Sequence, residues 1–268
     1  MEGVQGVERR LAGRFYFEDN FDVFDTEKWE VRGDHPKFNV QASDGWLNIL
    51  FDRVATDFER RLYWATVSSK KPFDLSNKTL MVRLTAVPNK LQPELPGLDY
   101  YVGVLLANKK DIVNNPLRSP DPDLKGVCYF MRWCYQTPIQ KYGCVIDKGV
   151  ATRYYGSVFA LFPPTELAVA VGLTKVVTYE EKIEDITMPL PVDPTSLYVH
   201  LFVQEWEYGT LLLPSRASFD YVLIGQPEFI VEYPKPEQVM MSTLPQVLSS
   251  IMAIMMVTVI LRLIRGMI

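Results

Sequence analysis

The first 240 residues contain no amphipathic helix of any length, and this constrains the fold more than any other feature. Short apolar or alternating segments are separated by turn residues, and about 13 of these segments have the length of a strand. The chain also holds 19 Pro, 14 Tyr, 14 Phe and 5 Trp, a composition that favours strands and turns over helices. The pattern predicts an all-β chain folded as a jelly-roll sandwich.

The predicted strands follow one another at the intervals of a two-sheet sandwich. The segments are residues 15–31 (strand, turn, strand), 37–51 (a hairpin around Ser43-Asp44-Gly45), 61–68, 79–87, 100–107, 126–136 paired with 143–147, 157–173, 174–187, 197–208 and 217–224. Residues 88–98 and 108–125 are rich in Pro, Asn and Asp, which predicts loops.

The C-terminal end carries a different signal, since residues 244–261 are without charge and two arginines follow. As a helix this stretch would be roughly 27 Å long, close to the hydrocarbon core of a bilayer at about 30 Å. We therefore predict a C-terminal transmembrane helix, with a helix buried in an oligomer core as the alternative. The anchoring residues would be Leu244, Val247, Leu248, Ile251, Ile254, Val257 and Leu261, and the basic tip would be Arg262 and Arg265.

These features predict three parts: a sandwich domain over residues 1–231, a proline linker over 232–243 and the membrane helix over 244–268. The first residues lack the apolar run of a signal peptide. A cytosolic domain on a tail anchor and a virion protein around an internal membrane both fit; export by a route not visible in the sequence is the third alternative. We expect lipid as a partner, together with homo- or hetero-oligomeric protein partners.

Charge and cysteine content narrow the chemistry. The net charge is −4 and the pI is about 5.4, so the main domain has no basic field to attract nucleic acid. No phosphate-binding glycine loop and no nucleophile elbow is present, and no cofactor is predicted. Asp121 and Asp123 offer oxygen ligands of the kind calcium prefers, although a solvated turn explains an Asp-Pro-Asp run better, so no metal is predicted.

The three cysteines fit no zinc pattern. Cys128 and Cys134 lie about 20 Å apart on one predicted strand, because a strand rises about 3.3 Å per residue, so they do not bond to each other. We predict free, buried thiols, with a disulfide between Cys134 and Cys144 across a hairpin as the alternative.

Several segments together resemble the concanavalin A-like, laminarinase-type jelly rolls. The opening strands are similar at Asn20-Phe21-Asp22, Lys28-Trp29 and Gly45-Trp46-Leu47, the next strand pair at residues 71–84, and the closing strands at Val199-His200, Glu205-Trp206 and Phe219-Asp220-Tyr221. The resemblance covers residues 15–85 and 197–225, while residues 88–196 do not match. It implies a concanavalin A-like sandwich.

The same resemblance implies a catalytic strand with the pattern Glu-x-Asp-x-x-Glu, which this sequence lacks. A retaining glycosidase needs two carboxyl groups about 5–5.5 Å apart. Glu180, Glu181, Glu184 and Asp185 form the nearest acidic cluster, with the wrong spacing. Glu205 and Glu207 share a strand face, but on a closing strand where the family's Glu is structural. The sequence therefore argues against a hydrolase.

One face of the strand over residues 197–208 mixes polar and aromatic side chains. In lectin-like jelly rolls, aromatic rings stack on sugars and polar groups bond their hydroxyls. We therefore take Arg132, His200, Gln204 and Trp206 as candidate glycan-binding residues. The alternative is that a loop or a neighbouring subunit covers this face, and that Arg132 forms a structural ion pair.

Our leading functional prediction is a non-catalytic, membrane-anchored structural or interaction subunit of a larger assembly, such as a virion with an internal membrane or an envelope complex. This rests on architecture alone. The second hypothesis is a membrane-held, lectin-like glycan-binding module, which predicts an exposed Trp206. The third is a divergent glycoside hydrolase.

Overall fold

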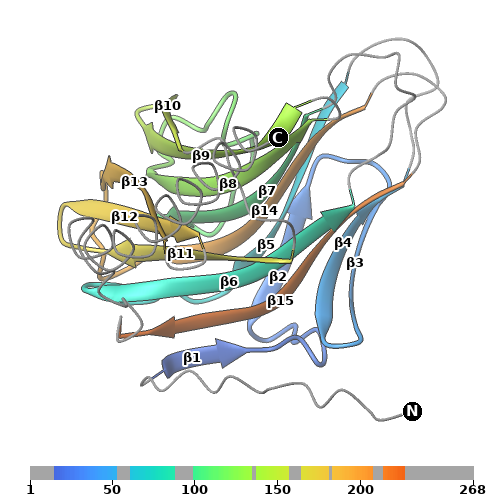
Figure 1. The fold of residues 1–268 in the computed structure, drawn as a ribbon, viewed down its shortest axis with the longest axis horizontal. Helices are drawn as coiled ribbons and strands as arrows, with labels where there is room; N and C mark the ends of the chain where they lie inside the picture. Colours follow the sequence, from blue (N-terminus) through green and yellow to red (C-terminus); the bar gives the residue numbers. More distant parts are fainter. Residues whose placement is uncertain are drawn as a thin grey trace, which may run out of the picture. The chain divides into compact units, whose positions relative to one another are not determined.

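The computed structural model describes residues 15–52, 61–87, 99–134, 137–156, 164–180, 183–207 and 214–226. These residues form two sheets in which every neighbouring pair of strands is antiparallel (Figure 1). The all-β sandwich that the sequence predicts is confirmed. The chain divides into two units, residues 1–229 and 230–268, and all described residues belong to the first.

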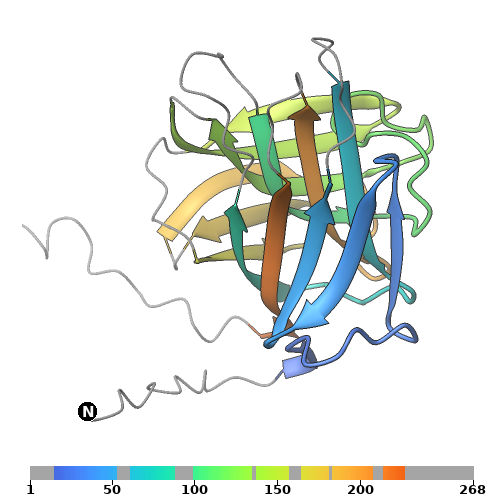
Figure 2. The same ribbon diagram turned by 90° about the vertical axis from the view of Figure 1, so that its right-hand side faces the viewer.

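The 8-stranded sheet is built from strands of both ends of the chain. Its order is β13 (Ile183–Pro189), β12 (Lys175–Glu180), β11 (Thr165–Val171), β6 (Lys78–Val87), β15 (Ser215–Gly225), β4 (Trp46–Phe51) and β3 (Phe38–Ser43), with β1 (Phe15–Asp19) also pairing with β15. Figure 2 shows the blue N-terminal strands beside β15, in orange, which returns from the far end of the chain.

The 7-stranded sheet has a similarly non-sequential order. It runs β10 (Val150–Tyr155), β9 (Thr137–Asp147), β8 (Gly126–Cys134), β7 (Asp99–Ala107), β14 (Tyr198–Glu207), β5 (Arg61–Ser69) and β2 (Trp29–Gly33). The late strand β14 lies between β7 and β5, so the closing segment of the chain completes the middle of this sheet.

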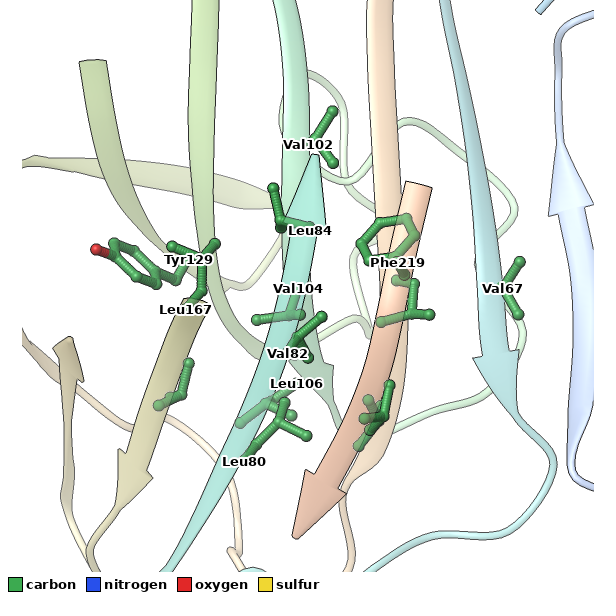
Figure 3. Close-up of a cluster of buried hydrophobic side chains, with 14 of the residues drawn as sticks. Val67, Leu80, Val82, Leu84, Val102, Val104, Leu106, Tyr129, Leu167 and Phe219 are labelled. Atoms are coloured by element: carbon green, nitrogen blue, oxygen red, sulfur yellow. The ribbon is translucent and has the colours of Figure 1, made fainter. Parts of the chain in front are cut away.

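The core lies between the two sheets, where alternate residues of each strand point inward. Figure 3 shows Leu80, Val82 and Leu84 of β6 meeting Val102, Val104 and Leu106 of β7. All six side chains are at most 1% exposed. A fully buried aliphatic side chain of this kind stabilises the fold by about 1.5–3 kcal/mol relative to an exposed one.

The opening motif of the chain is explained by one buried carboxylate. Asp19 is 6% exposed, and its two oxygens accept hydrogen bonds from the Phe21 backbone N–H at 3.0 Å and from Trp29 Nε1 at 2.8 Å. The Lys28 ammonium lies 3.4 Å away. Asp19 thereby fixes the turn after β1, in which Phe21 adopts the left-handed φ of 53°. The residues that carry the family resemblance here serve the fold.

The turn predicted at Ser43-Asp44-Gly45 is confirmed between β3 and β4. Asp44 and Gly45 both have positive φ, at 55° and 73°, as a two-residue type I′ hairpin requires. The same geometry recurs at Lys148 and Gly149, with φ of 51° and 74°. This second turn introduces β10, a strand that the sequence did not predict. Its side chains are mostly exposed or half-buried, so it lacks the apolar alternation of a core strand.

Two further predictions need correction. Residues 174–187 form not one strand but the hairpin of β12 and β13. The alternative disulfide between Cys134 and Cys144 is wrong, because the register places Cys144 opposite Cys128 and Cys134 opposite Thr137. Cys134 is thus six residues, or about 20 Å, along the strand from the level of Cys144. Cys128 and Cys144 are free and buried, as predicted.

The predicted membrane helix over residues 244–268, with its anchoring residues and basic tip, lies outside the described residues, as does the linker over 232–243. Among the residues that are described, none forms a helix that could span a membrane.

Candidate functional site

The outer face of the 7-stranded sheet collects the candidate residues. The opposite face of this sheet belongs to the core through Val199, Leu201 and Val203 of β14. Strand alternation therefore points the side chains of His200, Phe202, Gln204 and Trp206 outward. This confirms the two faces that the sequence predicts for this strand. The outer face has two differently built ends along β14, the His200 end and the Trp206 end.

The His200 end is covered by the loop over residues 108–125. Ile112, Leu117 and Leu124 of this loop belong to one buried cluster with Leu105 and Cys128 of the sheet. Asn108 closes the base of the loop, since its backbone N–H donates to the Lys125 carbonyl at 2.9 Å and its Oδ1 accepts from the Lys125 N–H at 2.8 Å. The expected alternative, a loop over the outer face, is therefore correct for this end.

His200 serves the fold and is not available to a ligand. It is fully buried, its Nδ1 lies 2.7 Å from Ser68 Oγ, and its Nε2 lies 3.2 Å from the Lys109 carbonyl oxygen. Burial lowers the pKa of His200 to about 3, although the bond to Lys109 acts in the opposite direction. The imidazole is neutral near pH 7 and fastens loop 108–125 to the sheet.

The Trp206 end begins at a row of side chains that crosses five strands. Register pairs place Gln140 (β9) opposite Arg132 (β8), Arg132 opposite Tyr101 (β7), Tyr101 opposite Gln204 (β14) and Gln204 opposite Trp64 (β5). Neighbouring strands lie about 4.8 Å apart, so the row spans roughly 19 Å. We call these five residues the polar-aromatic row. It brings together two of the candidate residues predicted from the sequence, Arg132 and Gln204.

Gln204 lies in the middle of this row with an unsatisfied amide. Its side chain is 3% exposed, and its Oε1 atom is buried without a hydrogen-bond partner in the part of the chain that the structure describes. Leaving a buried acceptor unsatisfied costs about 1–3 kcal/mol. Such an atom in a native fold requires a reason, and a bound polar ligand is one.

Trp206 lies one outward position beyond Gln204 and is partly exposed. The guanidinium carbon of Arg118 lies 4.5 Å from the centroid of its ring. Arg118 itself is exposed and belongs to loop 108–125. The loop that seals the His200 end therefore also reaches the Trp206 end, with a cation on an aromatic surface.

Arg132 is held by an aromatic cluster on the outer face. Its Nη1 donates to the Tyr142 hydroxyl at 3.1 Å, and this hydroxyl in turn donates to Gln140 Oε1. Rings follow one another across the sheet, with centroid distances of 5.3 Å from Tyr101 to Phe130 and 5.6 Å from Phe130 to Tyr142. Arg132 is half-buried, and its guanidinium contacts the aromatic residue Tyr142.

The acidic residues singled out by the sequence lie elsewhere. Glu205 faces the interior of the sandwich, is 3% exposed and accepts a hydrogen bond from Ser215 Oγ. Burial raises the pKa of the neighbouring Tyr100 hydroxyl, and the charge of Glu205 adds to this. The side chain of Glu207 lies outside the described residues. A shared catalytic face for these two glutamates is therefore not supported, because Glu205 points into the core.

Glu180 and Asp185 belong to a buried ionic cluster between the two sheets. Lys141 of β9 forms an ion pair with Glu180 of β12 and lies 3.7 Å from a carboxylate oxygen of Asp185. The Tyr129 hydroxyl donates to Asp185 at 2.9 Å, and burial followed by this carboxylate raises the pKa of Tyr129 well above its ordinary value. The lysine and both carboxylates are at most 3% exposed, so the cluster joins the sheets.

Asp121 and Asp123 also form ion pairs within the protein. The Lys109 ammonium lies 3.3 Å from Asp121 and 2.7 Å from Asp123. Asp121 further accepts from the Asn114 amide at 2.5 Å. The solvated turn expected from the sequence is in fact a braced loop, in which a lysine occupies the space between the acids.

Sequence analysis missed Arg118, Trp64, Tyr101 and Gln140. Trp64 and Tyr101 face outward on strands that the sequence did predict, so strand alternation could have found them. Gln140 lies on β9 between the predicted strands 126–136 and 143–147, where the sequence predicted no strand. Arg118 could not be found in this way, because it lies on a loop and only the folded chain brings it to Trp206.

No model of a known protein family matches this sequence, and no curated protein is similar to it in sequence. Solved structures are similar in fold. One is an endo-acting O-glycanase of the human gut microbiota that initiates mucin breakdown, with 17% identity, a TM-score of 0.52 and coverage of 80% of this chain and 99% of that chain.

Two other similar structures are glucanases. A β-1,3-1,4-glucanase (lichenase) from a mouse hindgut metagenome shows 16% identity and a TM-score of 0.52, covering 78% of this chain and 98% of that one. The endo-β-1,3-glucanase of Pyrococcus furiosus shows 13% identity and a TM-score of 0.53, covering 80% of this chain and 94% of that one.

These comparisons correct our leading functional prediction. We expected a non-catalytic structural subunit and no enzyme, whereas the structures that are similar in fold are glycan-degrading enzymes. The analogy with virion and envelope assemblies was architectural and has no support among them. What the comparisons show of this chain is its fold: it is a concanavalin A-like jelly-roll sandwich.

Proposed function

We propose that this protein acts on glycan chains, as a divergent relative of the endo-glycanases whose fold it shares. The observation that carries this proposal is the polar-aromatic row on the outer face of the 7-stranded sheet. The row places Gln140, Gln204 and Arg132 across adjacent strands of one face. The rings of Trp64 and Tyr101 in this row are buried, at 3% and 5% exposed, so the aromatic surface open to a sugar is that of the partly exposed Trp206. Sites for polar ligands combine apolar and aromatic walls with a few placed polar groups in this way.

The catalytic carboxylates of a Glu-x-Asp-x-x-Glu strand are not found on the described outer face of the central strands. On the central strands β5, β7, β8, β9 and β14, no described side chain on the outer face is a carboxylate, and β8 presents Cys128, Phe130 and Arg132 there. A general acid and a second carboxylate for hydrolysis would therefore come from other segments of the chain.

The test is a combined binding and cleavage assay on the full-length protein. Mucin-type O-glycans, β-1,3-glucan and β-1,3-1,4-glucan are offered, and release of new reducing ends is measured beside affinity electrophoresis. We expect retardation by at least one glycan with slow release of reducing ends, and loss of both in Trp206→Ala. Retardation without release would overturn the hydrolytic part of the proposal, and neither effect with any glycan would overturn all of it.

We also propose that residues 244–268 hold the sandwich at a membrane as a single C-terminal span. The support is in the sequence, an uncharged stretch over residues 244–261 followed by Arg262 and Arg265. Carbonate extraction of membranes from expressing cells tests this, with a chain that ends at residue 231 as the control. We expect the full chain in the pellet and the short chain in the supernatant; extraction of both would contradict the anchor.

A further inference from the structure

We propose that the glycan bound at the Trp206 end carries negatively charged substituents, sulfate or carboxylate groups, and that Arg118 and Arg132 bind them. This inference rests on the proposed function and names its substrate class. It follows from the charges of the outer face, from the position of Arg118 on the Trp206 ring and from the unsatisfied amide of Gln204.

The acids near this face are already occupied by other cations. Glu30 of β2 pairs with Arg32 at 2.6 Å and with Lys110 at 2.9 Å. In loop 108–125, the two aspartates at positions 121 and 123 share Lys109, and Asp111 lies 2.7 Å from Arg32. None of these carboxylates pairs with Arg118. The Trp206 end therefore presents arginine to an incoming ligand without a described carboxylate to neutralise Arg118.

Arg118 is placed to bind an anionic group of the ligand. Its guanidinium carbon lies 4.5 Å from the centroid of the Trp206 ring, and a cation–π contact at an exposed site is weak. A sugar ring can therefore take the place of the guanidinium on the indole. The displaced arginine then binds a sulfate or carboxylate of the same sugar through two parallel N–H donors, which its planar fork allows.

Arg132 supplies a second cation on the same face. It stands in the polar-aromatic row beside Tyr101, two strands from Gln204. Its bond to the Tyr142 hydroxyl fixes the guanidinium against the sheet, so little side-chain freedom is lost when an anion binds.

Gln204 provides a hydrogen-bond acceptor for a hydroxyl group of the ligand at this end. Its buried Oε1 has no partner among the described residues, and a sugar hydroxyl is the donor that would satisfy it. The Trp206 end thus recognises two features of one ligand: Gln204 accepts a hydrogen bond from a hydroxyl, and Arg118 and Arg132 donate to the anionic group. Neutral glycans supply only the first.

The experiment compares matched glycans on the full-length protein by isothermal titration calorimetry. One pair is a sulfated galactan and its desulfated form; the other is a polyuronate and its carboxyl-reduced form. Charge-assisted hydrogen bonds contribute about 1.5–3 kcal/mol each, so we expect a preference of about 10- to 100-fold for the anionic member of one pair. This preference should shrink as salt is raised. Which pair shows it distinguishes sulfate from carboxylate.

Variants assign the preference to the arginines. Arg118→Ala should weaken binding of the anionic glycan about tenfold or more and leave the neutral form within threefold, while Arg118→Lys should restore only part of it. Arg216→Ala is the control, because it removes an exposed arginine from the 8-stranded sheet. Unchanged thermal unfolding of Arg118→Ala excludes a folding defect.

The outcomes separate the two proposals. Equal binding of charged and neutral glycans, or no effect of Arg118→Ala on the preference, overturns the anionic substrate and leaves the proposed function standing. Failure of every glycan to bind or be cleaved overturns the proposed function, and this inference with it.

Discussion

The His200 end and the Trp206 end of the outer face both use outward-pointing side chains of β14, yet they differ in how their polar groups are satisfied. At the His200 end both ring nitrogens of His200 have partners, and loop 108–125 covers the sheet with Ile112, Leu117 and Leu124. At the Trp206 end the side-chain oxygen of Gln204 has no partner among the described residues, and Arg118 lies exposed on the Trp206 ring. The difference teaches that burial alone does not identify a site. Unsatisfied polar groups next to exposed aromatic and cationic side chains do.

The largest effect should come from removing a loop residue that covers the His200 end. Leu124 is fully buried, so Leu124→Ala leaves a cavity and should lower the free energy of unfolding by about 2–5 kcal/mol. Urea denaturation measures this loss. Arg118→Ala, at an exposed position of the same loop, removes only the contact with the Trp206 ring and should lower the free energy of unfolding by at most about 1 kcal/mol. Similar values for the two variants would mean that the loop does not seal this end.

The protonation of His200 should make the His200 end sensitive to acid. Its pKa is about 3 in the folded state against an ordinary 6.5, so the unfolded chain binds a proton between these values while the folded chain does not. This contribution to stability is therefore complete above pH 6.5 and is lost as pH falls toward 3. Between pH 7 and pH 5 the loss should be about 2 kcal/mol, measured by urea denaturation at each pH. The same loss in His200→Gln would show that another group is responsible.

A smaller effect is expected from the partner of this histidine. Ser68→Ala removes the hydroxyl that lies 2.7 Å from His200 Nδ1 and leaves a buried ring nitrogen unsatisfied. The free energy of unfolding should fall by about 1–2 kcal/mol. Ser119→Ala, at an exposed position of the loop, is the control and should be near neutral. Equal stability of the two variants would show that the hydrogen bond between Ser68 and His200 does not stabilise the His200 end.

At the Trp206 end the corresponding change should have the opposite sign. Gln204→Leu replaces an amide whose oxygen has no partner in the described part of the chain by an apolar side chain of similar size, so stability should stay equal or rise by up to about 1 kcal/mol. Glycan affinity should fall in the same variant. A clear loss of stability would show that Gln204 is part of the structural framework, like His200, and would erase the contrast between the two ends.

Much of the fold was predictable because local patterns agree with it. The hairpin at Asp44-Gly45, the inward positions of β14 and the buried thiols all follow from residue type and alternation. Strand β10 escaped prediction because an exposed edge strand carries no apolar alternation. The error over Cys134 and Cys144 came from register, which depends on the pairing of β8 with β9 and not on the sequence of either strand.

The candidate site was predictable only in part. Outward alternation on two strands identified Arg132, Gln204 and Trp206, and it identified His200 for the same reason. Nothing in the sequence separated His200 from the other three, because a loop of 18 residues, 108–125, decides which positions of one face are covered.

By itself, the sequence determined the sandwich class, most strands, their inward faces and the lack of a Glu-x-Asp-x-x-Glu strand, since these depend on residue type and on the two-residue period of a strand. Tertiary structure alone decided the order of strands in each sheet, the turn of Glu205 into the core, the union of Lys141 with Glu180 and Asp185, and the meeting of Arg118 with Trp206. The physical reason is that each of these joins segments distant in the chain, and only packing brings them together.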